Sequence, residues 1–121
     1  MPQASTKKSG RTDVSQVVFD RAHLTQYTME SPELEREIVG LFLAQLPGIL
    51  DRLRKGCTGA DWRIATHTLK GSALAIGARR IGDLARELEA AYGAGEARQE
   101  LLSELVHAID EFDAVARQAY P

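Results

Sequence analysis

The sequence predicts an all-α fold, an antiparallel up-down four-helix bundle with a short extra N-terminal helix. Apolar residues recur at three- and four-residue spacing from Val17 onward, which is the period of amphipathic helices. β-branched residues never form the long alternating run that is typical of a strand. Helix start and stop residues divide the chain into four long segments with short connections, and short connections favour antiparallel neighbours.

The first two helices are marked by the residues that start them. Asp20 can cap a short helix that ends near Tyr27, because its carboxylate can accept a hydrogen bond from a free N–H of the first turn. Ser31, followed by a proline and an acidic residue, begins a long helix that should reach about Lys55. We expect the core stripe of this helix to consist of Leu34, Ile38, Leu41, Phe42 and Ile49.

The other three helices are separated by glycines. One should start between Thr58 and Asp61, with Asp61 as the expected cap, and end before Gly77. The next should cover about residues 78–92, and the last about residues 96–119. The expected apolar face of the last helix consists of Leu101, Leu105, Ile109, Phe112, Val115 and Ala119.

Length and composition limit the classes of protein. The 121 residues suit one domain, and we expect a flexible polar tail over residues 1–15 and the bundle domain over residues 16–121. A formal net charge of -2 argues against a nucleic-acid partner, and the single cysteine excludes an intrachain disulfide. No apolar run approaches the roughly 20 residues that span a membrane, and no secretory signal is apparent. We therefore expect a cytoplasmic protein without a membrane partner.

The segment from residue 61 to 78 places one reactive side chain on a surface that the bundle should not bury. On a helix with roughly 100° per residue, His67 falls roughly 140° from Trp62 and should face solvent. The residues within roughly 60° of Trp62, which should face the core, are Ala65, Leu69, Ala73 and Ile76.

The neighbours of His67 favour a docking site over a merely solvated histidine. Gly71 costs about 1 kcal/mol relative to alanine inside a helix, and here it points outward beside His67, where it leaves room for another surface. Ile64 and Leu74 add exposed apolar contacts. Lys70, one turn along, can reach an anion held on the imidazole.

This segment resembles the signature of histidine-containing phosphotransfer (Hpt) domains, and the resemblance covers about residues 19–119. The residue before the histidine is often alanine in that family and is Thr66 here. The residues that carry the resemblance are His67-Thr68-Leu69-Lys70-Gly71-Ser72, then Gly77-Ala78, Leu84 and Leu88-Glu89.

The resemblance implies that His67 is the phosphoacceptor, that Lys70 helps to neutralise the phosphoryl group, and that Gly71 gives a receiver domain close access. Response-regulator receiver domains and a sensor or hybrid histidine kinase are then the expected partners. Because the sequence offers few acidic groups close to His67, we expect no cofactor on this chain and Mg²⁺ on the partner receiver. The expected docking residues are Gly71, Ile64, Leu74, Arg63, Thr68 and Ala75.

Three other classes of protein are alternatives to a phosphotransfer domain. An autonomous kinase needs a nucleotide site, and the sequence has neither a G-x-x-x-x-G-K-[ST] loop nor a G-x-G-x-x-G turn after a strand. A metal protein is disfavoured because His23, His67 and His107 form no i,i+4 pair. A non-phosphorylated helical adaptor, which binds receiver or kinase domains through the same face, remains an alternative function.

The sequence also bears on the oligomeric state: a single docking patch on the protein fits a monomer.

Overall fold

The computed structural model describes residues 18–55, 58–93 and 95–121, and within these ranges it contains helices and no strand. The all-α prediction is confirmed. The polar tail expected over residues 1–15 lies outside the described residues. The helices are α2 (Arg21–Thr28), α3 (Pro32–Arg54), α4 (Gly59–Ile76), α5 (Arg79–Ala90) and α6 (Glu96–Ala119).

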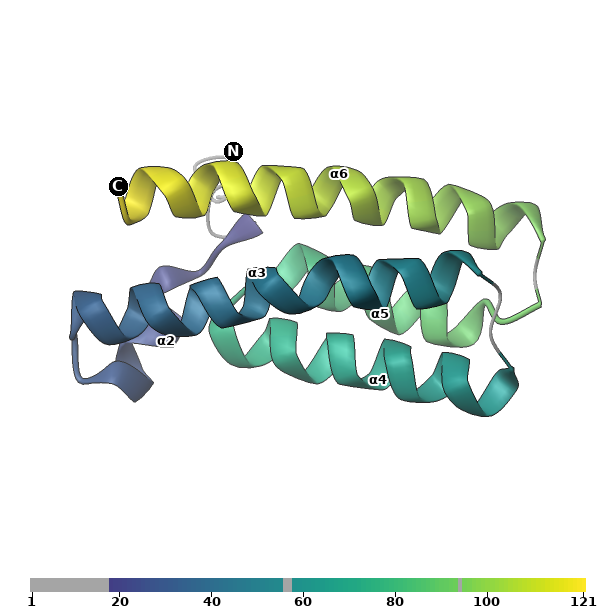
Figure 1. The fold of residues 1–121 in the computed structure, drawn as a ribbon, viewed down its shortest axis with the longest axis horizontal. Helices are drawn as coiled ribbons and strands as arrows, with labels where there is room; N and C mark the ends of the chain where they lie inside the picture. Colours follow the sequence, from purple (N-terminus) through teal and green to yellow (C-terminus); the bar gives the residue numbers. More distant parts are fainter. Residues whose placement is uncertain (1–17, 56–57, 94) are drawn as a thin grey trace, which may run out of the picture.

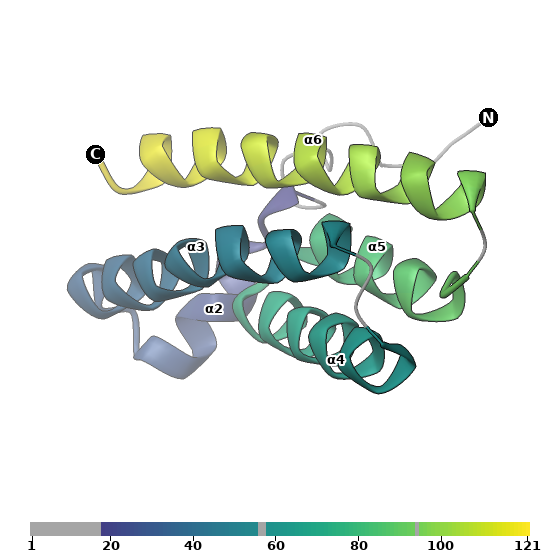
Figure 2. The same cartoon turned by 45° about the vertical axis from the view of Figure 1, so that its right-hand side comes forward.

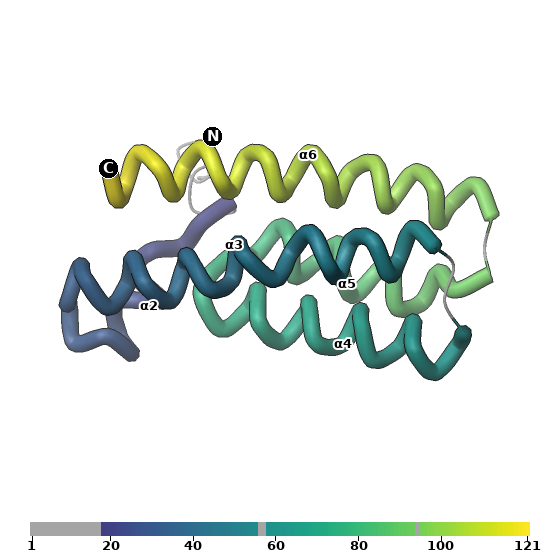
Figure 3. The backbone as a smooth tube through the Cα atoms, in the orientation of Figure 1, coloured from purple at the N-terminus to yellow at the C-terminus, as the bar shows by residue number. Residues whose placement is uncertain are grey.

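The four long helices run alternately up and down, as Figure 1 and the tube in Figure 3 show. They pack as a ring in which α3 and α5 each contact both α4 and α6. The turned view in Figure 2 shows α6 along one side of the bundle and α4 along the other. The short helix α2 packs against α3 and α4. This arrangement leaves one long side of α4 without a neighbouring helix of the ring.

Polar side chains and a glycine set the helix boundaries. The Ser31 hydroxyl accepts a hydrogen bond from the N–H of Leu34 at 3.3 Å and caps α3, as predicted. The expectation for α4 was wrong in detail, because Thr58 is the cap and Asp61 donates its backbone N–H to it at 3.2 Å. Gly77 ends α4 with a φ of 90°, a left-handed conformation that glycine adopts readily.

The core stripe predicted for α3 was wrong in part: Phe42 and Ile49 are buried as expected and Ile38 is partly buried, but the other two residues are not. Leu34 and Leu41 are exposed, whereas Val39 is buried, and so is the carboxylate residue Glu35. The physical reason is that Glu35 finds hydrogen-bond partners inside the protein, so a stripe drawn through apolar residues alone is rotated away from the true one. The buried residues of α3 are Glu35, Val39, Phe42, Leu46, Ile49 and Leu53.

The predicted face of α6 was also shifted. Leu105 and Phe112 are buried as expected, but Leu102 and two alanines complete the buried face in place of the other predicted residues. The alanines are buried because small side chains let neighbouring helices approach closely. The other four predicted residues lie at the edges of this face, where they are partly buried against the core. The buried residues of α6 are Leu102, Leu105, Ala108, Phe112 and Ala116, and those at the edges are Leu101, Ile109, Val115 and Ala119.

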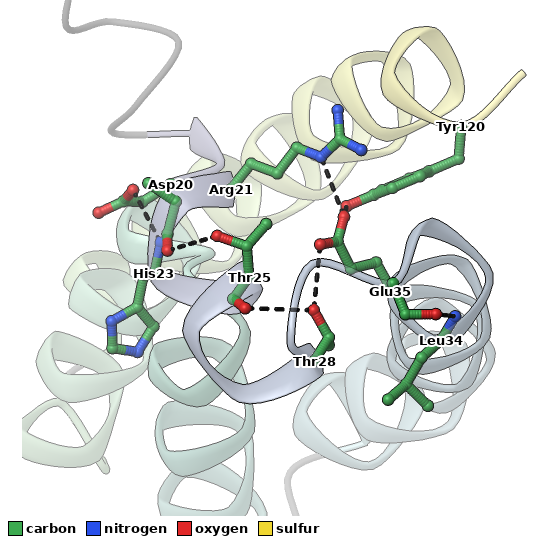
Figure 4. A network of polar contacts seen from close by, with 10 residues as sticks. Asp20, Arg21, His23, Thr25, Thr28, Leu34, Glu35 and Tyr120 are labelled. Carbon is green, nitrogen blue, oxygen red and sulfur yellow. Dashed lines mark hydrogen bonds and ion pairs between the residues drawn. The ribbon is translucent and has the colours of Figure 1, made fainter.

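Four residues from α2, α3 and the C-terminal end form a polar group that we call the buried cluster: Arg21, Thr28, Glu35 and Tyr120 (Figure 4). Glu35 is 1% exposed and accepts three hydrogen bonds. They come from Arg21 Nε at 3.1 Å, Thr28 Oγ1 at 3.1 Å and Tyr120 Oη at 2.9 Å. The cluster fastens α2 and the end of the chain to the first turn of α3.

The buried cluster shifts the pKa of three of its members. The hydrogen bond to Glu35 raises the pKa of the Arg21 guanidinium above its ordinary value. Burial alone would raise the pKa of Glu35, but the hydrogen bonds donated by Tyr120, Arg21 and Thr28 outweigh it and lower the pKa below its ordinary value. Burial, reinforced by the hydrogen bond to Glu35, raises the pKa of Tyr120 to about 12. Glu35 is therefore a buried carboxylate that is ionised at neutral pH and fully partnered.

Candidate functional site

Helix α4 has two contrasting sides. Its inner side is buried, and Trp62 anchors it by donating a hydrogen bond from Nε1 to the carbonyl of Leu88 on α5 at 2.8 Å. All five residues predicted for the inner side are buried, and so is Thr66. The other side, which we call the outward face of α4, consists of Arg63, Ile64, His67, Thr68, Lys70, Gly71, Leu74 and Ala75, of which Lys70 is half-buried and the others are exposed.

His67 lies in the middle of α4 and is exposed, as the helical wheel predicts. The residue before it, Thr66, is fully buried, yet its hydroxyl is satisfied by the carbonyls of Trp62 at 2.9 Å and Arg63 at 3.2 Å. A threonine at this position therefore fits the core as an alanine would. Because its other side is packed in the core, α4 is a rigid support that presents the imidazole of His67 to solvent.

Gly71 has open space around it. A Cβ built on Gly71 would meet no atom within 4 Å other than those of its own helix backbone and chain neighbours. By contrast, a Cβ on Gly82 of α5 would lie 2.7 Å from Cδ2 of Leu74. The fold of the described residues therefore explains the missing side chain of Gly82 and leaves that of Gly71 unexplained, which indicates that any requirement for glycine at 71 comes from outside the chain.

Leu74 is more enclosed than the wheel indicates. It is 36% exposed, compared with 56% for Ile64, and its side chain reaches over Gly82. Leu74 therefore lies at the boundary between α4 and α5. Ile64 remains the larger exposed apolar surface beside His67.

Lys70 has a partner that sequence reasoning missed. Its Nζ lies 3.3 Å from Oε1 of Glu89 on α5, and the two side chains are 25% and 31% exposed. Glu89 belongs to the Leu88-Glu89 pair quoted above as part of the family signature, so its position was available, but its contact with Lys70 depends on how α5 packs against α4. An acidic group therefore lies next to the candidate anion-binding lysine.

The outward face of α4 continues onto α3. A hollow of ≈ 260 Å³ between the two helices is lined by Ser72 and Ala75 of α4 and by Ile38, Leu41 and Gln45 of α3. Leu41 is 62% exposed. The sequence analysis did not identify Ile38 and Leu41 as surface residues, because it placed both in the core stripe of α3.

The remaining candidate features lie apart from this face. His107 is exposed on α6, and His23 lies in the first turn of α2 with its ring 5.4 Å from that of Tyr27. Among the described residues there is no group of three or more histidine, cysteine, aspartate or glutamate side chains that could hold a metal ion. None of the described helices is both long and apolar enough to cross a membrane.

The comparison with protein families gives one match, to the Hpt domain, over residues 37–117. This range covers α4 and α5 completely and most of α3 and α6, and it includes His67. Comparisons with curated proteins and with solved structures gave no significant match. Hpt domains take part in phosphorelay signalling, in which they interact with receiver domains and kinases. Since the match spans well over half of the chain, this protein belongs to the Hpt domain family.

Proposed function

We propose that the protein accepts a phosphoryl group on His67 and relays it to or from aspartates of response-regulator receiver domains. One observation carries the proposal: α4 buries one whole side and presents His67 on the other, next to a glycine around which a Cβ would find open space. This geometry serves a nucleophile that must be reached by another protein.

The chemistry follows from the imidazole. A neutral imidazole carries a lone pair on its unprotonated ring nitrogen, which can attack the phosphorus of an aspartyl phosphate. The new P–N bond forms as the P–O bond to the aspartate breaks, and the carboxylate leaves. The other ring nitrogen keeps its proton, so the step needs no acid or base from this chain. The rigid helix supplies positioning, which is the larger part of phosphoryl-transfer catalysis.

The surroundings of His67 suit a receiver domain. Arg63 and Lys70 flank His67 on the outward face and offer positive charge to a phosphoryl group or an acidic partner. The hollow between α3 and α4 offers an apolar contact through Leu41 and Ala75. Thr68 lies on the same exposed side and would contact the partner.

The metal would come with the partner. We expect Mg²⁺ to be bound by the receiver domain, since phosphoryl transfer commonly uses a divalent cation to neutralise developing charge. We further propose that the protein works as a monomer in the cytoplasm, where it would meet a sensor or hybrid histidine kinase and its receivers.

The test is to follow radioactive phosphate from autophosphorylated kinases and from phosphorylated receivers onto the wild type and His67→Gln. We expect acid-labile, base-stable label on the wild type and none on His67→Gln. The matched control is His107→Gln, because His107 is an exposed helical histidine outside the outward face of α4, and it should label like the wild type. EDTA should block the transfer that depends on a receiver.

Two results would overturn the proposal. Label taken directly from ATP, without any partner, would mean that the chain is a kinase. Absence of label from every donor, together with receiver binding that Leu41→Asp weakens, would favour the adaptor that binds through the same face without phosphorylation.

A further inference from the structure

We propose that Lys70 changes partners during the reaction: Glu89 holds its ammonium group in the unphosphorylated protein, and the phosphoryl group on His67 takes it over. Glu89 is then a positioning residue that acts through Lys70. Its charge sets how far the phosphotransfer equilibrium favours phosphorylated His67. This inference rests on the proposed function, because it concerns the phosphorylated state of the same histidine.

The helix geometry places Lys70 between two possible anions. Lys70 lies three residues after His67, a spacing at which side chains are neighbours on a helix surface. Helical side chains tilt toward the helix N-terminus, so the lysine stem leans back over the turn that carries His67. On its other side, Glu89 of α5 approaches Nζ to 3.3 Å. In the proposed exchange, a change in the χ angles of Lys70 moves Nζ from one anion to the other.

Electrostatics gives the direction of the exchange. A phosphoryl group carries a charge of about −1.5 to −2, whereas a carboxylate carries only one negative charge. The ion pair between Lys70 and Glu89 is single and partly exposed, with no other hydrogen bond from Lys70 Nζ among the described residues. Such a pair is weak enough to break and strong enough to oppose the exchange measurably.

The expected size of the change in the phosphotransfer equilibrium follows from the strength of partly exposed ion pairs. Glu89→Gln should raise the equilibrium constant for transfer from a receiver to His67 by about 1.5- to 5-fold, because Lys70 no longer leaves a charged partner. The same substitution in a Lys70→Gln background should change that constant by a clearly smaller factor. A Glu89 that orients His67 directly, or that only repels the phosphoryl group, would act equally in both backgrounds.

The experiment is a double-mutant cycle on the full chain with one receiver, comparing wild type, Glu89→Gln, Lys70→Gln and the double variant at equilibrium. Glu87→Gln is the matched control. Glu87 is an exposed carboxylate two residues before Glu89 on α5, so its substitution removes the same charge from a different side of the helix. Equal effects of Glu89→Gln with and without Lys70, or an equal effect of Glu87→Gln, would overturn the exchange.

A second measurement needs no partner protein. His23 and His107 are replaced by glutamine, and His67 is phosphorylated chemically with phosphoramidate. The chain has four lysines, so the side-chain ammonium signal of Lys70 can be assigned by ¹⁵N NMR and a Lys70→Gln spectrum. We expect phosphorylation to shift that signal, and Glu89→Gln to shift it only before phosphorylation. An unmoved Lys70 signal overturns the exchange even if receivers phosphorylate His67. Failure of every kinase and receiver to phosphorylate His67 overturns the proposed function, while the chemically phosphorylated protein still decides the exchange.

Discussion

Two carboxylates of this protein each pair with a cation, but their surroundings differ. Glu35 is 1% exposed and accepts hydrogen bonds from Arg21, Thr28 and Tyr120, which belong to α2 and the C-terminal end. Glu89 is partly exposed and, among the described residues, pairs only with Lys70. A carboxylate with three fixed donors has no reason to change partners, whereas one with a single flexible donor can release it.

The comparison extends to the two regions as a whole. The buried cluster satisfies its own polar groups and ties three parts of the chain together. The outward face of α4 leaves an exposed imidazole, exposed apolar side chains and open space at Gly71. In the buried cluster the polar groups bind one another. On the outward face of α4 the imidazole and the apolar side chains are exposed and could be contacted by a partner protein. Stability and phosphotransfer should therefore respond to different substitutions.

The largest effect on stability should come from Glu35→Ala. The substitution removes three hydrogen bonds and leaves the buried Thr28 hydroxyl without its carboxylate acceptor, whereas the Arg21 side chain, which is 44% exposed, can be solvated. We therefore expect a loss of about 2–3 kcal/mol in the free energy of unfolding. Denaturant unfolding followed by the fluorescence of Trp62 measures this loss. Glu37→Ala, an exposed acid on the same helix, is the control and should cost little. A loss similar to that of the control would mean that the cluster does not stabilise the fold.

A smaller loss, about 1 kcal/mol near neutral pH, is expected for Tyr120→Phe, which removes one hydrogen bond to Glu35. Because the pKa of Tyr120 in the folded protein is raised to about 12 from 10.0, its stabilising contribution is complete below pH 10. It should be lost as the pH rises from 10 towards 12. The stability advantage of the wild type over Tyr120→Phe should therefore fall across this range, and a difference that does not change with pH would contradict the assignment.

Gly71→Ala should separate stability from function. Since a Cβ there meets nothing, the substitution should raise the free energy of unfolding by up to about 1 kcal/mol through helix propensity. Phosphotransfer from a receiver should slow, because the methyl group fills space that the partner needs. Gly40→Ala is a matched control on α3, where a Cβ also meets nothing, and it should stabilise without slowing transfer. Transfer at the wild-type rate in Gly71→Ala would show that the open space has no role in docking.

The smallest effect on stability is expected for Glu89→Gln. A partly exposed ion pair contributes about 0–1 kcal/mol, so thermal or denaturant unfolding should change far less than it does for Glu35→Ala. A loss of stability as large as that of Glu35→Ala would place Glu89 in the same structural class as Glu35 and remove the contrast between the two carboxylates.

Periodicity and capping residues predicted the helices of this protein well. Ser31, Gly77 and the inner stripe of α4 were identified correctly because they depend on local geometry, namely one capping hydrogen bond, one left-handed residue and one helical period. The exposure of His67 follows from the same period. These features depend only on residues within one helix and at its ends.

The stripes of α3 and α6 could not be placed by the same reasoning. Glu35 is buried because Arg21 and Tyr120 reach it from distant parts of the sequence, and Ala108 and Ala116 are buried because neighbouring helices approach closely at small residues. Each of these facts concerns a contact between helices. Apolar periodicity therefore assigned Leu34 and Leu41 of α3 to the core, although both are exposed.

The sequence by itself determined the fold class, the helix boundaries to within a few residues, and the side of α4 on which His67 lies, because these depend on interactions between residues close together in the chain. Only the tertiary structure decided that Glu89 pairs with Lys70, that Leu41 is exposed beside the outward face of α4, and that Glu35 is buried. The physical reason is that burial and ion pairing depend on which helix lies opposite, and packing between helices fixes that choice.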